Sequence, residues 1–245
     1  LMRRRNIGIC PITYIICLSL LLFSGLASAS EESFSNMGAS AYIFTDVRSI
    51  GMGGLVSIPG YGGGGLFLNL AQLVHMKGKE IRSFNSQYFN SVNYKALGYI
   101  TGGFSIGLRS LKTEVDTTDE FGMPTGFSLI YSDTNYTMSG AGFINDSLAV
   151  GGRLNRYTLI VGEEKVTGSL IDLGFTKNYG NVQLSGLVQG LFGTITHFSN
   201  DYGKVKPRYQ LGIAYTFDEE NLFGVEIQSS RKIVMGTQID RKSVV

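Results

Sequence analysis

The chain has 245 residues, of which 43% are hydrophobic and 16% charged; 33 are glycine, and the formal net charge is +2. Three of its 21 basic residues stand at positions 3–5, so the rest of the chain carries 18 basic against 19 acidic residues and gives no support for nucleic-acid binding. Both cysteines, Cys10 and Cys17, lie in the first 29 residues, which excludes disulfides and thiol chemistry from residues 30–245.

Residues 1–29 have the three parts of a secretory signal peptide. The arginines at 3–5 precede a largely apolar stretch, 7–22, and the small residues at 27–29 form a cleavage site. The mature chain is therefore expected to start at Ser30. A permanent transmembrane helix is the competing interpretation, and Pro11 together with the nearby cleavage site disfavours it.

Residues 37–78 show no regular alternation of apolar and polar side chains, so they are not expected to form strands. Within them, 66–76 is short and apolar and is a candidate helix. The run 60–65 fits the pattern G-x-G-x-x-G of dinucleotide-binding loops, but Pro59 directly precedes it and no βαβ unit follows. We interpret these glycines as permitting a tightly folded loop.

From residue 80 onwards most of the chain alternates between apolar and polar or small side chains, as a strand with one apolar face does. The stretch 207–217 shows this well, because its odd-numbered residues from 209 are apolar or aromatic: Tyr209, Leu211, Ile213, Tyr215 and Phe217. The alternation predicts nine strands, at 80–90, 93–100, 103–113, 125–144, 147–161, 166–177, 181–197, 207–217 and 221–235.

The alternation also separates charged side chains from the apolar face. In 103–113, Phe104, Ile106 and Leu108 share one face. Four charged residues within predicted strands fall on the other parity: Arg109, Arg153, Asp172 and Glu226. A charge facing lipid at mid-bilayer costs about 2–4 kcal/mol, so this sorting is typical of strands that cross a membrane.

The predicted fold is all-β: a transmembrane antiparallel up-and-down β-barrel over 79–245, with an N-terminal hatch over 30–78 that contains a short helix. After Ser30 no apolar stretch is long enough for a spanning helix, and lipid satisfies no backbone hydrogen bonds. An envelope protein with alternating strands can then cross a bilayer only as a closed barrel. The expected location is the bacterial outer membrane.

The connections between strands support this prediction. Short turns at 101–103, 145–147, 178–181 and 218–221 alternate along the chain with polar loops at 114–124, 162–165 and 197–206. Bacterial barrels have short turns on the periplasmic side and longer loops outside, whereas a secreted β-sandwich, the alternative fold, has no reason to sort its loops in this way.

Nine strands is an odd number, and single-chain bacterial barrels normally have an even number. The chain also stops at Val244 and Val245 in a polar segment, without the terminal aromatic residue usual in such barrels. We interpret the chain as a truncated product of a longer barrel, in which about nine strands are present.

The start of the predicted hatch resembles a known family. Residues 46–54, Asp-Val-Arg-Ser-Ile-Gly-Met-Gly-Gly, followed by a glycine-rich gap and Phe-Leu-Asn-Leu-Ala-Gln-Leu at 67–73, are similar to the N-terminus of PorV/PorQ and FadL-like outer-membrane barrels. That family reads "lGMGGa" and then "NPAgL". Asn69, Ala71 and Leu73 match, while Leu70 replaces the usual proline and Gln72 the usual glycine.

The resemblance implies a barrel of about fourteen strands that is plugged near its periplasmic end by the hatch. It also implies one of two activities: passage of hydrophobic molecules such as long-chain fatty acids, or service as a cargo-carrying subunit of the type IX secretion system. We favour transport of a hydrophobic small molecule, with a moving gate formed by Gly51, Met52, Gly53, Gly54 and Asn69. Membrane lipid, an apolar ligand and secretion-system proteins are the partners that these hypotheses involve.

Enzymatic activity is not expected. The two histidines are His75, at the end of the candidate helix, and His197, in a polar loop with Ser199 and Asp201. Three polar residues in a polar loop fix no catalytic geometry, although a lipid-modifying enzyme of the outer membrane remains a third hypothesis. Two distant histidines without clustered carboxylates do not favour a metal site, and no cofactor is expected.

Overall fold

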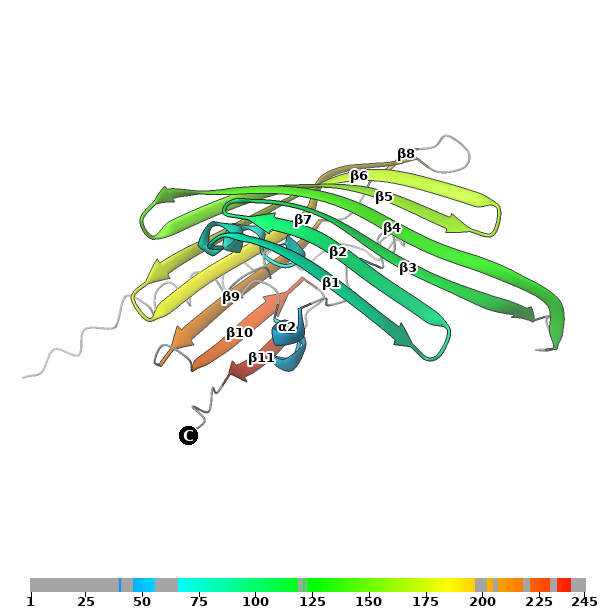
Figure 1. The fold of residues 1–245 in the computed structure, drawn as a ribbon, viewed down its shortest axis with the longest axis horizontal. Coiled ribbons are helices and arrows are strands. Elements are labelled where there is room, and N and C mark those ends of the chain that lie inside the picture. The colour runs from blue at the N-terminus through cyan, green and yellow to red at the C-terminus, as the bar shows by residue number, and fades with distance from the viewer. Residues whose placement is uncertain are drawn as a thin grey trace, which may run out of the picture. The chain divides into compact units, whose positions relative to one another are not determined.

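The alternating part of the chain forms one large antiparallel sheet in a computed structural model (Figure 1). The structure describes residues 40, 46–55, 66–118, 121, 123–196, 202–204, 207–217, 221–229 and 233–238, which all belong to the unit Phe34–Val245. The signal peptide, the glycine-rich run 60–65, the loop residues His197, Ser199 and Asp201, and residues 244–245 lie outside the described residues.

Two short helices precede the strands. The helix α2 is Val47–Gly51, and the 3-10 helix η3 is Leu70–His75. The strands are β1 Lys79–Tyr88, β2 Val92–Thr101, β3 Phe104–Thr118, β4 Pro124–Asn145, β5 Leu148–Val161, β6 Glu164–Tyr179, β7 Val182–Thr196, β8 Tyr202–Lys204, β9 Arg208–Thr216, β10 Leu222–Gln228 and β11 Ile233–Gln238.

The strands follow one another in an up-and-down order, in which each pairs with the next along the chain. The path runs β1-β2-β3-β4-β5-β6-β7-β9-β10-β11, and the short β8 pairs with β7 beside it. Among the described residues β1 and β11 are the two edges and do not pair with each other, so this part of the chain is an open sheet rather than a closed barrel. No helix in the described part of the chain is both long and apolar enough to cross a membrane.

The prediction of nine strands was wrong in two places. The predicted strand 221–235 is two strands, β10 and β11, which pair antiparallel with Ile227 opposite Ile233. The predicted loop 197–206 contains the short β8. The main path therefore has an even number of strands, and the all-β antiparallel prediction is confirmed.

The two faces of the sheet differ in what covers them. We call the face against which residues 66–76 pack the inner face, and the opposite one the outer face. Arg109, Arg153, Asp172 and Glu226 are buried on the inner face, whereas Leu154, Leu173 and Phe192 are exposed on the outer face. The predicted placement of these four charged residues away from the apolar face is therefore confirmed.

Candidate functional site

Residues 66–76, here called the inner segment, cross the inner face of the sheet. A turn at 66–68 leads to Asn69, which caps η3 by accepting a hydrogen bond from the amide of Ala71 at Oδ1, 3.1 Å away. Asn is a favoured cap because its short side chain reaches the free amides of the first turn. Six residues of the predicted helix 66–76 are thus helical, in a 3-10 rather than an α conformation.

The inner segment is apolar on nearly every side, and this explains why it is buried. Leu66, Leu70 and Leu73 are fully shielded from solvent. They form one cluster with wall residues of β2, β3 and β7: Tyr94, Ala96, Ile100, Leu111 and Leu187. Full burial of a leucine side chain contributes roughly 1.5–3 kcal/mol, so the cluster is the main force that keeps the segment on the sheet.

Glycines on the inner face provide the space for these side chains. Gly98 and Gly107 are cross-strand partners on β2 and β3, and Gly151 and Gly174 are partners on β5 and β6. A Cβ atom at Gly98 would lie 2.0 Å from Cδ2 of Leu66, and one at Gly107 would lie 2.9 Å from Cε1 of Phe67. Each glycine pair therefore forms a shallow seat in the sheet, the first for Leu66 and Phe67 and the second for Asn69 and Leu70.

Arg153 on β5 joins the wall to the inner segment. Its Nε donates to Oδ2 of Asp172 on β6 across 2.9 Å, and its Nη1 lies 3.3 Å from the carbonyl oxygens of both Leu66 and Leu68. The planar guanidinium suits this arrangement because its donors point in fixed, divergent directions. One buried cation thus bonds a carboxylate of the wall and two carbonyls of the segment.

Asp172 is bonded from the neighbouring strands as well. Its Oδ2 accepts from Nδ2 of Asn155 at 2.8 Å, and its Oδ1 accepts from the amide of Gly190 at 2.8 Å. Gly190 has φ +67° and lies where β7 bulges, opposite the register shift in β6 between Ile171 and Leu173. The bulge turns a backbone amide toward the carboxylate, which satisfies a charge that burial would otherwise penalise.

Asn69 makes the second polar contact of the segment. Its Nδ2 donates to the carbonyl of Phe175 at 3.1 Å and lies 3.5 Å from the carbonyl of Gly186. A Cβ atom at Gly174 would lie 2.5 Å from Oδ1 of Asn69 and 3.3 Å from Cγ of Leu70. The wall glycine and the cap residue are therefore fitted to each other.

Two further contacts tie the N-terminal region to β2, β3 and β4. The guanidinium carbon of Arg109 lies 4.9 Å from the ring centroid of Phe67, within the range of a cation–π interaction. Ser40 donates its amide to Oδ2 of Asp133 at 2.7 Å and accepts at its carbonyl from the hydroxyl of Tyr94 at 3.0 Å. These residues are buried, so the contacts act in a low dielectric.

Residues 46–55 occupy a different part of the inner face, beside β10 and β11 (Figure 1). Met52 and Leu55 are buried against Ala214, Leu222 and Val234. A Cβ atom at Gly236 on β11 would lie 2.3 Å from the carbonyl oxygen of Met52. At the other edge of the sheet, Asp46 forms an ion pair with Arg82 on β1, in which Oδ1 of Asp46 lies 3.7 Å from Nη1 of Arg82.

The end of α2 explains why glycines follow Met52. The amide of Gly53 donates to the carbonyl of Ile50 at 3.1 Å, and the amide of Gly54 donates to the carbonyl of Ser49 at 2.8 Å, as in helix C-caps. Gly53 has φ +76° and Gly54 φ +92°, a left-handed backbone that side chains disfavour. The sequence Gly-Met-Gly-Gly thus ends a helix and places Met52 on the sheet.

The predicted gate residues therefore contact two separate regions. Gly51, Met52, Gly53 and Gly54 belong to the segment beside β10 and β11, whereas Asn69 contacts β6 and β7. Whether any of them moves as a gate stays a prediction. Sequence analysis placed Arg153 and Asp172 on the inner parity but missed their bond. Predicted strands 147–161 and 166–177 are consecutive, so pairing them would have placed the two residues on neighbouring strands; in the structure they lie directly opposite each other.

The end of β3 and the beginning of β4 extend beyond the inner segment. They carry exposed apolar residues whose parity is that of the inner face. Val115 on β3 pairs with Leu129 on β4, and Phe127 lies two residues before Leu129 on β4. Val115 is 53% exposed and Phe127 75% exposed. We call Val115, Phe127 and Leu129 the apolar strip. It adjoins the partly buried Tyr131, which packs against the cluster of the inner segment.

His75 closes η3 and contacts the wall by its ring. It lies edge-on to Phe143 of β4, with the ring centroids 5.4 Å apart, and burial lowers the pKa of its imidazole. Among the described residues no group of three or more histidine, cysteine, aspartate or glutamate side chains is arranged to hold a metal ion. The geometry around His75 is thus that of a packed side chain.

Comparison with solved structures places this architecture beside a known transporter. The fold is similar to that of the toluene transporter TodX of Pseudomonas putida, with a TM-score of 0.50 and 15% sequence identity over 81% of this chain and 71% of that one. Comparisons with protein-family models and with curated proteins give no match. The predicted resemblance to FadL-like barrels is confirmed at the level of the fold, and the neighbour is a transporter rather than an enzyme.

Proposed function

We propose that the protein resides in the bacterial outer membrane and transports a hydrophobic small molecule. The observation that carries this proposal is the apolar strip of Val115, Phe127 and Leu129, which continues the inner face from exposed strand ends toward the buried cluster of the inner segment. Exposed apolar side chains on the inner face favour the binding of an apolar solute, because binding removes apolar surface from water.

The likeness in fold to a toluene transporter supports the same proposal, although fold alone does not determine function. The site adds a physical reason. An apolar solute on the strip has the inner segment beneath it, which is seated by leucines and bonded by Arg153 and Asn69. Movement of that segment would open a path along the inner face.

Several polar contacts that hold the inner segment on the sheet are long, which suits reversible movement. The contacts of Arg153 with the carbonyls of Leu66 and Leu68 are 3.3 Å long, and the second contact of Asn69 is 3.5 Å. Hydrogen bonds of this length are weaker than bonds near 2.9 Å, although the charge of Arg153 strengthens its own. A solute that displaces the leucines would have to break these contacts and the 3.1 Å bond from Asn69 to Phe175.

The test is uptake and direct binding of a labelled long-chain fatty acid. Uptake is measured in bacterial cells whose outer membrane otherwise excludes the label, and binding is measured on the purified protein in detergent. Phe127→Asn should lower both, because it places an amide on the apolar strip. Ile130→Asn is the matched control, since Ile130 is 44% exposed on the opposite parity of the same strand.

Gly53→Val tests the predicted gate. A side chain is strained at φ +76°, and Cβ would lie 3.3 Å from the carbonyl oxygen of Met235, so the 46–55 segment should be displaced and uptake altered. Absence of both uptake and binding in the intact protein would remove the transport proposal. The predicted role as a subunit of the type IX secretion system, which requires a protein-binding outer surface, would then remain to be tested.

A further inference from the structure

Arg156 on β5 is a cation on the outer face, in contrast to the buried inner cations Arg109 and Arg153. It is exposed, and its cross-strand partners are Tyr136 on β4 and Ser169 on β6. Its Nη1 donates to Oγ of Ser169 at 2.8 Å. The ion pairs among the described residues do not include Arg156, so its charge is not neutralised there.

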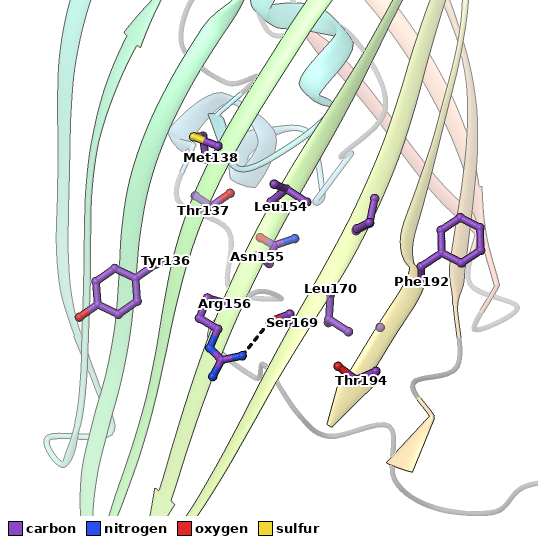
Figure 2. A pocket seen from close by; sticks show the side chains of 12 residues that line it. Tyr136, Thr137, Met138, Leu154, Asn155, Arg156, Ser169, Leu170, Phe192 and Thr194 are labelled. Atoms are coloured by element: carbon purple, nitrogen blue, oxygen red, sulfur yellow. Dashed lines mark hydrogen bonds between the residues drawn. The ribbon is translucent and has the colours of Figure 1, made fainter. Parts of the chain in front are cut away.

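A hollow of about 510 Å³ lies beside Arg156 across β4, β5, β6 and β7 (Figure 2). Its outer-face walls are largely apolar, and Figure 2 shows Met138 and Leu154 lying along the strands on one side of Arg156 and Ser169. Phe192 on β7 forms a further apolar wall and is 65% exposed. The hollow is thus an apolar slot with a single cation toward one end.

Arg156 marks a change in the character of the outer face. On the side toward the β4–β5 turn, its outer-face neighbours are Leu154, Met138 and Ile171. On the other side the next outer-face residues are hydroxylic: Thr134, Thr158, Thr167 and Thr194. The outward-facing apolar band of a barrel ends where the strands leave the hydrocarbon and enter the headgroup region.

The depth of Arg156 agrees with this boundary. Arg156 stands eight residues after Leu148, where β5 begins. Leu148 follows a short turn, of the kind that lies on the periplasmic side. With a rise of about 3.3 Å per residue and a tilt of about 40°, that is roughly 20 Å along the barrel axis, against an apolar band of about 25 Å. Its long side chain can then extend to the headgroups of the outer leaflet.

We propose that this hollow binds one anionic membrane lipid whose headgroup is a phosphate monoester, with an acyl chain along Leu154 and Phe192 and the phosphate on Arg156. Charge complementarity selects the headgroup, because an unneutralised guanidinium at the edge of an apolar slot matches a phosphate attached to a hydrocarbon chain. The inference rests on the membrane location in the proposed function and is independent of transport.

The test uses the absence of tryptophan from the chain. Tyr136→Trp introduces one fluorophore at the hollow, in full-length protein inserted into phosphatidylcholine vesicles. Quenching by brominated phosphatidic acid is compared with quenching by brominated phosphatidylcholine. Ile213→Trp is the control position, because it lies on the outer face of β9 between the apolar partners Leu184 and Val225.

We expect the Trp at 136 to prefer phosphatidic acid by about fivefold or more, as for a charge-assisted bond, and the Trp at 213 to show a ratio near one. Adding Arg156→Met should bring the ratio at 136 near one, and Arg156→Lys should restore part of it. Lys165→Met, which removes another exposed cation of β6, should leave the preference intact. Excess inorganic phosphate should not abolish it.

Three results would overturn the proposal. An unchanged ratio in the Arg156→Met variant would show that the arginine does not select the lipid. An equal loss in the Lys165→Met variant would reduce the effect to general surface charge, and loss with inorganic phosphate would assign the site to a free anion. Absence of quenching by both lipids at both positions would reject the membrane location itself, whereas failed fatty-acid uptake alone would leave the lipid site standing.

Discussion

Gly174 and Asn69, 105 positions apart in the chain, occupy one fitted contact: a Cβ atom on Gly174 would lie 2.5 Å from Oδ1 of Asn69. The same oxygen accepts the capping bond from Ala71. The side chain that starts the 3-10 helix is therefore also the one that approaches the wall most closely at this point. A change on β6 should for this reason disturb the inner segment without altering it directly.

Gly174→Ala should destabilise the protein by about 1–3 kcal/mol, because the added methyl group displaces Asn69 and Leu70. The measurement is the free energy of unfolding in detergent micelles, together with protease sensitivity of residues 66–76. Gly152→Ala on β5 is the matched control. Its Cβ would meet only Cδ2 of Leu173 at 3.8 Å, so stability should change by less than about 0.5 kcal/mol.

Arg153→Met should cost about 3–5 kcal/mol, because it leaves the carboxylate of Asp172 buried without its cation. The double variant Arg153→Met with Asp172→Asn should recover most of that loss, since an amide at 172 can still accept from Gly190. Unfolding in micelles measures both. Equal stability of the single and double variants would mean that the charge on Asp172 is not what the arginine balances.

Substitutions on the two faces should have opposite consequences. Leu173→Asp and Leu211→Asp place a charge on the outer face and should cost about 2–4 kcal/mol of insertion free energy at mid-membrane. Gln210→Asp and Gln183→Asp lie on the inner parity and should insert normally. The assay is the yield of folded protein in vesicles, and equal tolerance of all four would contradict a membrane-spanning sheet.

The seating of the inner segment should depend on pH through His75. Burial lowers the pKa of its imidazole, so the folded protein binds fewer protons there than the unfolded chain does. The stability from His75 is fully present above its ordinary pKa of 6.5 and is lost as the pH falls through the lowered value. Protease sensitivity of 66–76 should therefore rise on acidification. His75→Gln should reduce this pH dependence, and an unchanged profile would exclude His75 as its source.

Most of the sheet could be predicted from the sequence because its signal is local. Alternation with a period of two is carried by each strand alone, and polar turns separate the strands. The division of 221–235 was missed because Ile233 and Met235 continue the apolar alternation of Val225 and Ile227 along the sequence. Strand periodicity does not show where one strand ends and the next begins when the same alternation continues.

The candidate site was less predictable because its contacts join distant parts of the chain. Sequence alone placed Arg153 on the inner parity, but the carbonyls of Leu66 and Leu68 carry no sequence signal as acceptors. The paired seat glycines Gly98 with Gly107 and Gly151 with Gly174 emerge only when the strands are in register. Arg156 was overlooked for a related reason, since its role depends on the hollow beside it.

The long separation of these contacts sets an order for folding. Leu66 meets Arg153 87 residues later, and Asn69 meets Phe175 106 residues later. Closing such long loops costs entropy before any contact can compensate it, so the seat cannot precede β5 and β6. The inner segment is synthesised before every strand that holds it, so it can be seated only after β5 and β6 are present.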